Sequence, residues 1–201
     1  MEYSASGERL LEIASQLFYT EGIGAIGVDR VAEESGVSKP TLYAQFKNKA
    51  GLAAAVLQRR SDNRMRTITA YVDALPADEP SKVLALFDFF IQGHAKPGFR
   101  GCPFTNAAAE LPDGTHPARI VISEYKAWMR SLLTQLAEDD GLDNPAWWGS
   151  TLMLLIDGAN ARVITTSDAN SMKDARQSAE VMLVNAQTPT GSAEILKEEC
   201  Q

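Results

Sequence analysis

Apolar side chains recur every three to four positions along most of the chain, which is the spacing of one face of an α-helix. No stretch alternates apolar and polar residues in the way of a half-buried strand. Asn48, Ser81 and Asn144 stand where three of the helices should begin and are predicted N-caps. The pattern predicts an all-α fold of about nine helices, over residues 6–21, 28–35, 39–46, 49–74, 81–94, 104–110, 118–140, 145–166 and 171–186.

One short stretch predicts two helices joined by a tight turn. Gly36 stands where the first helix must end, and only a residue without Cβ takes the left-handed conformation there without cost. Val37 is expected to fill the angle between the helices. Ser38 is a good N-cap for the second helix, and Pro40 in its first turn loses only an amide that would be unpaired in any case. Residues 31–46 therefore predict a helix-turn-helix.

The second of these helices has a buried side and a small, polar outward side. Leu42 and Phe46 share the inward side, and they must be packed because an isolated helix needs about 12–15 residues in water. The flat outward side could approach base edges in a major groove. The expected DNA contacts are Lys39 and Gln45 to base edges or adjacent phosphates, Thr41 and Tyr43 to phosphates, Ala44 as an apolar base contact, Lys49 to a phosphate, and Pro40 on the same face.

The net charge of −7 is unfavourable for binding DNA, but the charge is unevenly distributed. Residues 1–66 carry nine Lys and Arg against eight Asp and Glu, whereas residues 67–201 carry ten against eighteen. Lys39, Lys47 and Lys49 cluster around the second helix of the motif. A positive edge is therefore expected on a protein that is acidic as a whole.

From about residue 9 to residue 57 the sequence resembles the TetR family of bacterial transcriptional regulators. The resemblance rests on the capped turn, the Thr-Leu-Tyr triplet that begins at Thr41, the aromatic Phe46 and the Lys-Asn-Lys that follows it. Gly27 departs from the Thr or Ser that the family often has there, and it offers no hydroxyl for a phosphate contact. The resemblance implies a homodimeric repressor on a palindromic operator, released by a small ligand bound in a helical body.

The length of the chain allows one sizeable core and a small satellite domain. We expect a helix-turn-helix DNA-binding domain over residues 1–48, a bridging helix over 49–74, and a helical ligand-binding and dimerisation domain over 75–201. Two recognition units are needed about 34–36 Å apart on a palindromic site. The last two helices are the expected interface, because a two-fold axis would pair them as a four-helix bundle.

The bridging helix carries four arginines and could transmit movement between the two domains. A charge run of this kind is usually a solvated face, and we favour that interpretation over a DNA contact. The four are Arg59, Arg60, Arg64 and Arg66.

The ligand site is specified less sharply than the DNA-binding motif. Aromatic and methionine side chains of the body could line an apolar cavity with a few polar groups that orient a ligand, and plain core packing is the alternative for each. The candidates are Phe87, Phe90, His94, Cys102, Phe104, Asn106, Tyr125, Trp128, Met153 and Asp157. Asp157 lies in an apolar run and needs pairing or solvent. We expect it to pair with Arg119 or Arg130, to lie in the dimer interface or to face the pocket.

Cys102 gives an alternative function. It precedes a short predicted helix and has Lys96 and Arg100 nearby, an environment that favours the reactive thiolate. It could therefore sense oxidants or electrophiles. The competing interpretation is a buried small hydrophobe.

Other function classes find little support in the sequence. There is no Gly-x-Ser-x-Gly elbow and no phosphate-binding loop, so we expect no enzyme, no catalytic residues and no cofactor. His94 and His116 lack metal spacing, and Cys102 and Cys200 make no disulfide framework. The apolar run at residues 152–156 cannot span a bilayer, and residues 1–7 lack signal-peptide character, so a cytoplasmic protein without a membrane partner is expected. A helical adaptor that does not bind DNA is the remaining rival.

Overall fold

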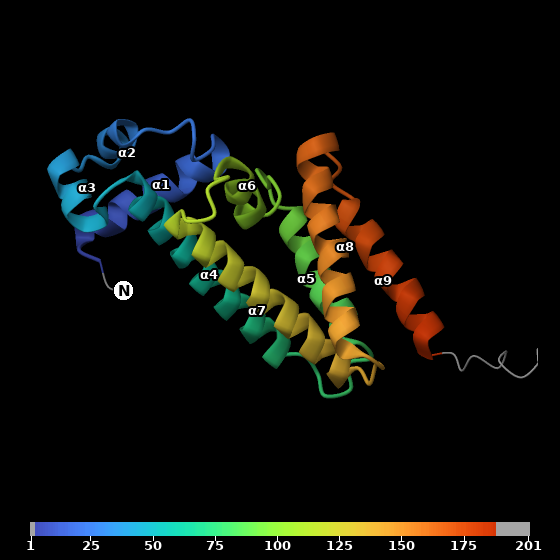
Figure 1. Cartoon of the computed structure of the whole chain (residues 1–201). Helices are drawn as coiled ribbons and strands as arrows, with labels where there is room; N and C mark the ends of the chain where they lie inside the picture. The colour runs from blue at the N-terminus through green and yellow to red at the C-terminus, as the bar shows by residue number, and fades with distance from the viewer. Residues whose placement is uncertain (1–2, 188–201) are drawn as a thin grey trace, which may run out of the picture.

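The computed structural model describes residues 3–187, and its regular elements over that range are all helices (Figure 1). They are α1 (Ala5–Thr20), α2 (Val28–Ser35), α3 (Lys39–Phe46), α4 (Lys49–Asp73), α5 (Lys82–His94), α6 (Pro103–Glu110), α7 (Pro117–Asp139), α8 (Pro145–Thr166) and α9 (Ser171–Gln187). The predicted all-α class is confirmed, and the predicted helix ends differ from the observed ones by at most one residue, as helix ends commonly do. Cys200 and the end of the expected third domain lie outside the described residues.

Of the N-caps predicted at Asn48, Ser81 and Asn144, the first two are confirmed. The Asn48 side chain accepts a hydrogen bond from the amide of Gly51, and the Ser81 hydroxyl accepts one from the amide of Leu84. Asn144 occupies the N-cap position of α8, but its side chain makes no capping bond. Its backbone is left-handed with φ of 54°, a conformation that asparagine tolerates, so here the residue turns the chain instead of capping the helix.

The first three helices pack around a shared apolar centre at one end of the molecule (Figure 1). Leu10 and Leu11 of α1 are fully buried, and Val31 of α2 and Leu42 of α3 join them. Such a short α3 is stable only through this packing, because an isolated helix of its length would not persist in water.

The long helix α4 leaves the α1–α3 unit and packs along α7, and α8 and α9 lie at the far end of the molecule (Figure 1). Buried side chains from α1 to α9 form one continuous apolar cluster. A displacement in the body can therefore reach α1 through packed side chains. None of the helices in residues 3–187 is long and apolar enough to cross a membrane.

Candidate DNA-binding face and internal cavity

The turn between α2 and α3 has the chemistry that the sequence predicts. Gly36 is left-handed, with φ of 64° and ψ of 24°, and its amide donates to the Glu33 carbonyl at 3.1 Å. Val37 is 6% exposed and its amide donates to Ala32. The Ser38 hydroxyl accepts from the amide of Thr41 in the first turn of α3. These bonds fix the angle at which α3 leaves the turn.

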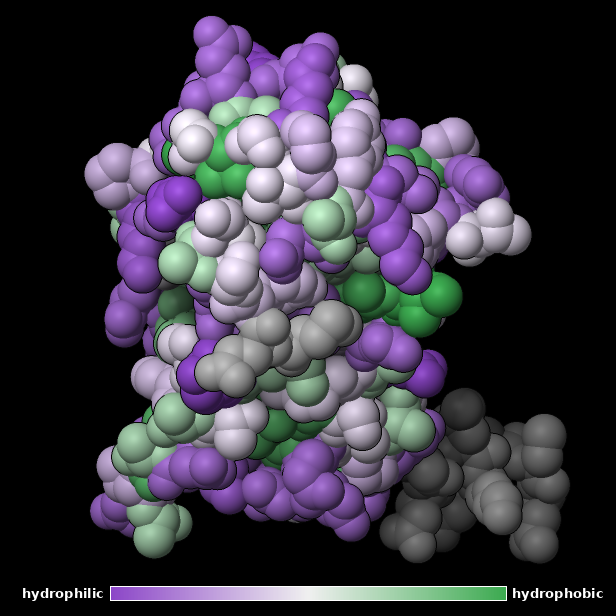
Figure 2. Space-filling view, turned by 90° about the vertical axis from the view of Figure 1, so that its left-hand side faces the viewer, coloured by the Kyte–Doolittle hydropathy of each residue, from purple (hydrophilic) through white to green (hydrophobic). Residues whose placement is uncertain are grey.

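One side of α3 anchors the helix and the other is open. Leu42 and Phe46 are buried, at 0% and 4% exposure, whereas Tyr43 is 46% exposed. Of the other expected DNA contacts, Lys39, Pro40 and Ala44 are exposed, and Thr41, Gln45 and Lys49 are half-buried. Figure 2 views the end of the molecule that carries α3, and hydrophilic and near-neutral residues make up most of that surface.

Three of the polar candidates on or beside α3 already have partners within the chain. Lys39 Nζ lies 2.8 Å from Asp29 Oδ1, and this hydrogen bond raises the pKa of Lys39. Gln45 Nε2 donates to the Ser4 hydroxyl at 3.2 Å, and Lys49 Nζ donates to the Gly24 carbonyl at 3.2 Å. All three contacts are exposed, and surface contacts of this kind contribute little, so a phosphate or base edge can replace them.

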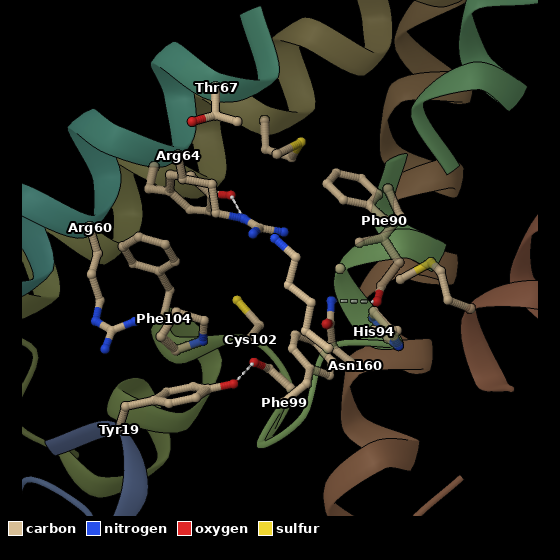
Figure 3. Close-up of a pocket in the computed structure, with 18 of the residues that line it drawn as sticks. Tyr19, Arg60, Arg64, Thr67, Phe90, His94, Phe99, Cys102, Phe104 and Asn160 are labelled. Carbon is tan, nitrogen blue, oxygen red and sulfur yellow. Dashed lines mark hydrogen bonds between the residues drawn. The ribbon is translucent and has the colours of Figure 1, made fainter. Parts of the chain in front are cut away.

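A cavity of about 630 Å³ lies between α1, α4, α5, α7 and α8 and the loop that precedes α6 (Figure 3). This volume falls within the range of about 300–1,000 Å³ that is common for small-molecule sites. Seven of the ten expected ligand residues line it, and they come from four helices and the loop. They are Phe90, His94, Cys102, Phe104, Tyr125, Met153 and Asp157.

The other three candidates do not line this cavity, so that part of the expectation is wrong. Phe87 is 0% exposed within the apolar core. Asn106 lies by a much smaller pocket and uses its amide to hold the Arg100 carbonyl at 2.8 Å. Trp128 is half-buried, with its ring 5.9 Å from that of Tyr125. Helical spacing identified all three as inward-facing, but it cannot show which inward side faces a void.

Charged residues of α4 were the main omission from the expected ligand site. Arg59, Arg60 and Arg64 line the cavity and are half-buried, so the expected solvated face is wrong for them. Only Arg66 of the four is exposed. A sequence signal existed: positions 53, 56, 60 and 64 form one helical stripe, and the first two are buried alanine and valine.

Arg60 and Arg64 are held without a carboxylate partner among the described residues. Arg60 donates to the Ser15 carbonyl at 2.7 Å, its guanidinium lies 4.9 Å from the centre of the Tyr19 ring, and burial lowers its pKa. Arg64 Nε donates to the Tyr125 hydroxyl at 3.1 Å. Burial raises the pKa of Tyr125 to about 12, so this hydroxyl remains a neutral acceptor. Arg59, by contrast, pairs with Glu8.

Among the described residues, Asp157 is the single acidic residue on the cavity wall, and it pairs with Lys126 across α7 and α8. The expected partners Arg119 and Arg130 are therefore wrong. Arg119 instead donates to the Ala108 carbonyl at 3.1 Å. Lys126 occupies a position on α7 from which its flexible stem can reach α8, so it neutralises the one acid of the wall.

His94 places an unpartnered imidazole on the cavity wall. The residue is 8% exposed, and neither ring nitrogen makes a hydrogen bond within the described part of the chain. Its ring centroid lies 4.3 Å from that of Phe99. Burial lowers the pKa of His94. The neighbouring Asn160 side chain raises this pKa, and the positive charge of Arg64 lowers it further. Residues 3–187 contain no group of three His, Cys, Asp or Glu side chains that could hold a metal ion.

Side chains of α1 connect the cavity to the α1–α3 unit. The Tyr19 hydroxyl accepts from the Arg100 amide at 2.7 Å and donates to the Gly101 carbonyl at 3.1 Å. Gly101 is left-handed, with φ of 74°, and a Cβ there would lie 2.7 Å from the Asn160 carbonyl oxygen. The loop before α6 is therefore clamped between α1 and α8.

The fold and the motif have counterparts among known proteins. The family model for "Bacterial regulatory proteins, tetR family" matches residues 10–56. SCO4454, a TetR-family transcriptional regulator from Streptomyces coelicolor, is 31% identical with a TM-score of 0.82, over 91% of this chain and 96% of that one. The sav143 protein of Streptomyces avermitilis, described as a TetR-type transcriptional regulator, is 30% identical with a TM-score of 0.74, over 88% and 99%.

Curated relatives match over shorter segments. The HTH-type transcriptional activator FasR of Mycolicibacterium smegmatis is 40% identical over 99 residues, which are 46% of this chain and 42% of FasR. The HTH-type regulator YvkB of Bacillus subtilis is 39% identical over 59 residues, 31% of its length. The chain thus spans less than half the length of these curated relatives.

Proposed function

Since this chain belongs to the TetR family of bacterial regulatory proteins, we propose that it is a sequence-specific DNA-binding transcriptional regulator. The observation that carries the proposal is the α3 helix. Leu42 and Phe46 anchor it, and its opposite side is small, polar and open to solvent. That side fits a major groove, where amides and cations recognise base edges and lysines neutralise phosphates.

The proposal divides the chain into three parts. Residues 1–48 bind DNA, residues 49–74 connect the two domains, and residues 75–201 bind an effector and dimerise. The protein would act in the cytoplasm, where its DNA partner lies, and the proposal assigns it no catalytic role. Repression is typical of the family, so we assign repression relieved by a small effector.

A homodimer would place two α3 helices on a palindromic operator. Five of the seven large hydrophobic side chains that are exposed among the described residues lie on α8 and α9, which supports the use of these helices as the interface. Leu154 on α8 is 73% exposed, and Ile120 on α7 is 58% exposed. Leu154→Glu should convert the dimer to a monomer in sedimentation at micromolar concentration, whereas Ile120→Glu should not. A monomeric wild-type protein would refute this part of the proposal.

Release of DNA would pass through the contacts between α1 and the cavity wall. Ser15 and Tyr19 belong to the α1–α3 unit, and they hold Arg60 and the loop at Arg100 and Gly101. An effector that attracts Arg60 or moves this loop would change the position of α1 and hence of α3. The effector would act by differential affinity for the two positions, as any allosteric ligand must.

The DNA-binding proposal is tested with duplexes from the DNA that flanks the gene of this protein. We expect tight binding to one duplex, about 10³-fold or more over a scrambled duplex, with affinity falling as salt rises. A screen for compounds that dissociate the complex then identifies the effector. Equal, weak binding to both duplexes would favour the helical adaptor instead.

Cys102 supports a second candidate, control by oxidants or electrophiles. Its side chain lines the cavity at the N-terminal end of α6, where a reactive compound entering the cavity would meet it. If this candidate is correct, Cys102→Ser should bind DNA normally and no longer release it on treatment with oxidants or electrophiles. A serine variant that still responds to each of them would end the sensor hypothesis.

A further inference from the structure

The charged side chains of the cavity wall are mostly positive. Within residues 3–187, five cationic side chains line it, from Arg59, Arg60, Arg64, Lys96 and Lys126, against the single carboxylate of Asp157. Glu8 and Asp157 neutralise Arg59 and Lys126. Arg60 and Arg64 keep their charges without a carboxylate partner among the described residues, in a protein whose net charge is −7. Partly buried charges of this kind call for a counter-ion.

We propose that the cavity binds an organic acid: a carboxylate on an apolar body, with the carboxylate held by Arg64 and the adjacent Arg60. This inference rests on the proposed function, since it names the chemical class of the effector.

Arg64 is positioned as an anchor for the acid. Figure 3 shows its side chain extending from α4 into the cavity, opposite Phe90, His94 and Asn160. Its Nε bonds to the Tyr125 hydroxyl, which fixes the plane of the guanidinium and leaves the terminal nitrogens for a ligand. A guanidinium with two free N–H groups on one edge binds a carboxylate through two parallel hydrogen bonds.

The remaining wall suits an apolar body with one further polar group. Phe90, Phe104, Met129, Met153, Ile156 and Met172 supply aromatic and flexible aliphatic surface. The His94 imidazole is 8% exposed and both of its nitrogens lack a partner in the described residues, so it offers a hydrogen bond to whatever occupies the cavity. Buried polar groups in proteins are nearly always paired, and a ligand would pair this one.

Arg60 connects this chemistry to the DNA-binding unit. It is one helical turn from Arg64 on α4 and donates to the Ser15 carbonyl on α1. A carboxylate in the cavity would compete with that carbonyl for the guanidinium. An acid would therefore weaken a contact between α4 and α1, whereas a neutral analogue of the same shape would not.

The test measures direct binding by titration calorimetry to the DNA-free protein, so that a failure of DNA binding cannot be mistaken for a failure of this inference. The probes are matched pairs, decanoate with decanamide and 2-naphthoate with 2-naphthamide. We expect at least one acid to bind about tenfold or more tightly than its amide, because a hydrogen-bonded charge pair outweighs a neutral contact. If no acid exceeds its amide, the inference is overturned.

Two variants of α4 locate the anchor. Arg64→Met keeps an unbranched, flexible stem and removes the guanidinium with its charge, and it should reduce the preference for the acid to nearly none while the amide binds as before. Arg66→Met is the matched control, because Arg66 is exposed on the same helix, lies outside the cavity wall and donates a hydrogen bond to Asn63. Unchanged melting curves verify that both variants fold. An Arg64→Met protein that retains the full acid preference would contradict the assignment.

Discussion

The turn before α3 and the cavity are built in opposite ways. In the turn, the hydrogen bond between Ser38 and Thr41 spans three positions of sequence. At the cavity, Arg64 bonds to Tyr125 over 61 positions and Tyr19 bonds to Gly101 over 82. A local arrangement is encoded in one short stretch, whereas the cavity exists only after distant helices have packed. Perturbations of the two regions should therefore have separable effects.

The largest effect is expected at the buried side of α3. Leu42→Ala removes a fully buried side chain and should lower the free energy of unfolding by about 2–5 kcal/mol and abolish DNA binding. The neighbouring Tyr43→Ala removes an exposed ring and should change stability by about 0.5 kcal/mol or less while weakening DNA binding. Urea unfolding and DNA titration of both variants measure this contrast. Similar stability losses in the two variants would show that α3 is not anchored as described.

The equivalent change at the cavity is Gly101→Ala. A Cβ would lie 2.7 Å from the Asn160 carbonyl, and the left-handed backbone adds strain, so we expect a loss of about 1–3 kcal/mol and of effector binding. DNA binding without effector should persist. Gly98→Ala is the control, because Gly98 is also left-handed but has open space around it. Equal losses in the two variants would exclude the close approach as the cause.

These two regions also differ in how far the sequence predicts them. The turn was predicted residue by residue because Gly36, Ser38 and Pro40 act through their immediate neighbours. The cavity was predicted only in part, because nothing local to Arg64 indicates Tyr125. Four arginines within eight residues favour a solvated helix face. Only the buried residues one and two turns earlier on α4 indicate that Arg60 and Arg64 face inward. Asn144 shows that a local preference can also fail: the residue is expected to cap α8, but in the fold its left-handed backbone turns the chain and its side chain makes no capping bond.

Within the DNA-binding face, we expect Gln45 to contribute to sequence preference and Lys49 to contribute to affinity for any duplex. Gln45→Ala should change the preference at one base position by about 1–3 kcal/mol. Lys49→Ala should weaken all duplexes about equally and reduce the slope of log affinity against log salt by about one. Binding titrations on single-base operator variants at several salt concentrations distinguish them. The division of roles fails if the two variants behave alike.

His94 gives the cavity a pH dependence that the DNA-binding unit does not share. Burial lowers its pKa, so the unfolded chain takes up a proton that the folded protein does not. The free energy of unfolding should therefore fall as the pH drops below about 6.5, the ordinary value for histidine. His94→Leu should flatten this dependence in urea unfolding between pH 7 and pH 5. An unchanged slope in the variant would show that His94 is not its source.

The smallest expected effect concerns the start of α2. Gly27 makes no side-chain capping bond there, and its backbone, with φ of −82° and ψ of 157°, accepts a serine without strain. Gly27→Ser should add a few tenths of a kcal/mol to stability and offer a hydroxyl to a phosphate. Thermal melting and DNA titration detect both gains. A lower melting temperature would indicate an unfavourable contact at this position.

In the proposed function, the outward side of α3 is the surface that recognises DNA. The direct measurement is an anisotropy titration of wild type and the Tyr43→Ala, Gln45→Ala double variant against the operator and a scrambled duplex. We predict that the double variant folds as the wild type does and loses most of the preference for the operator. A folded double variant that keeps the full preference would contradict the account, because recognition would then lie elsewhere on the protein.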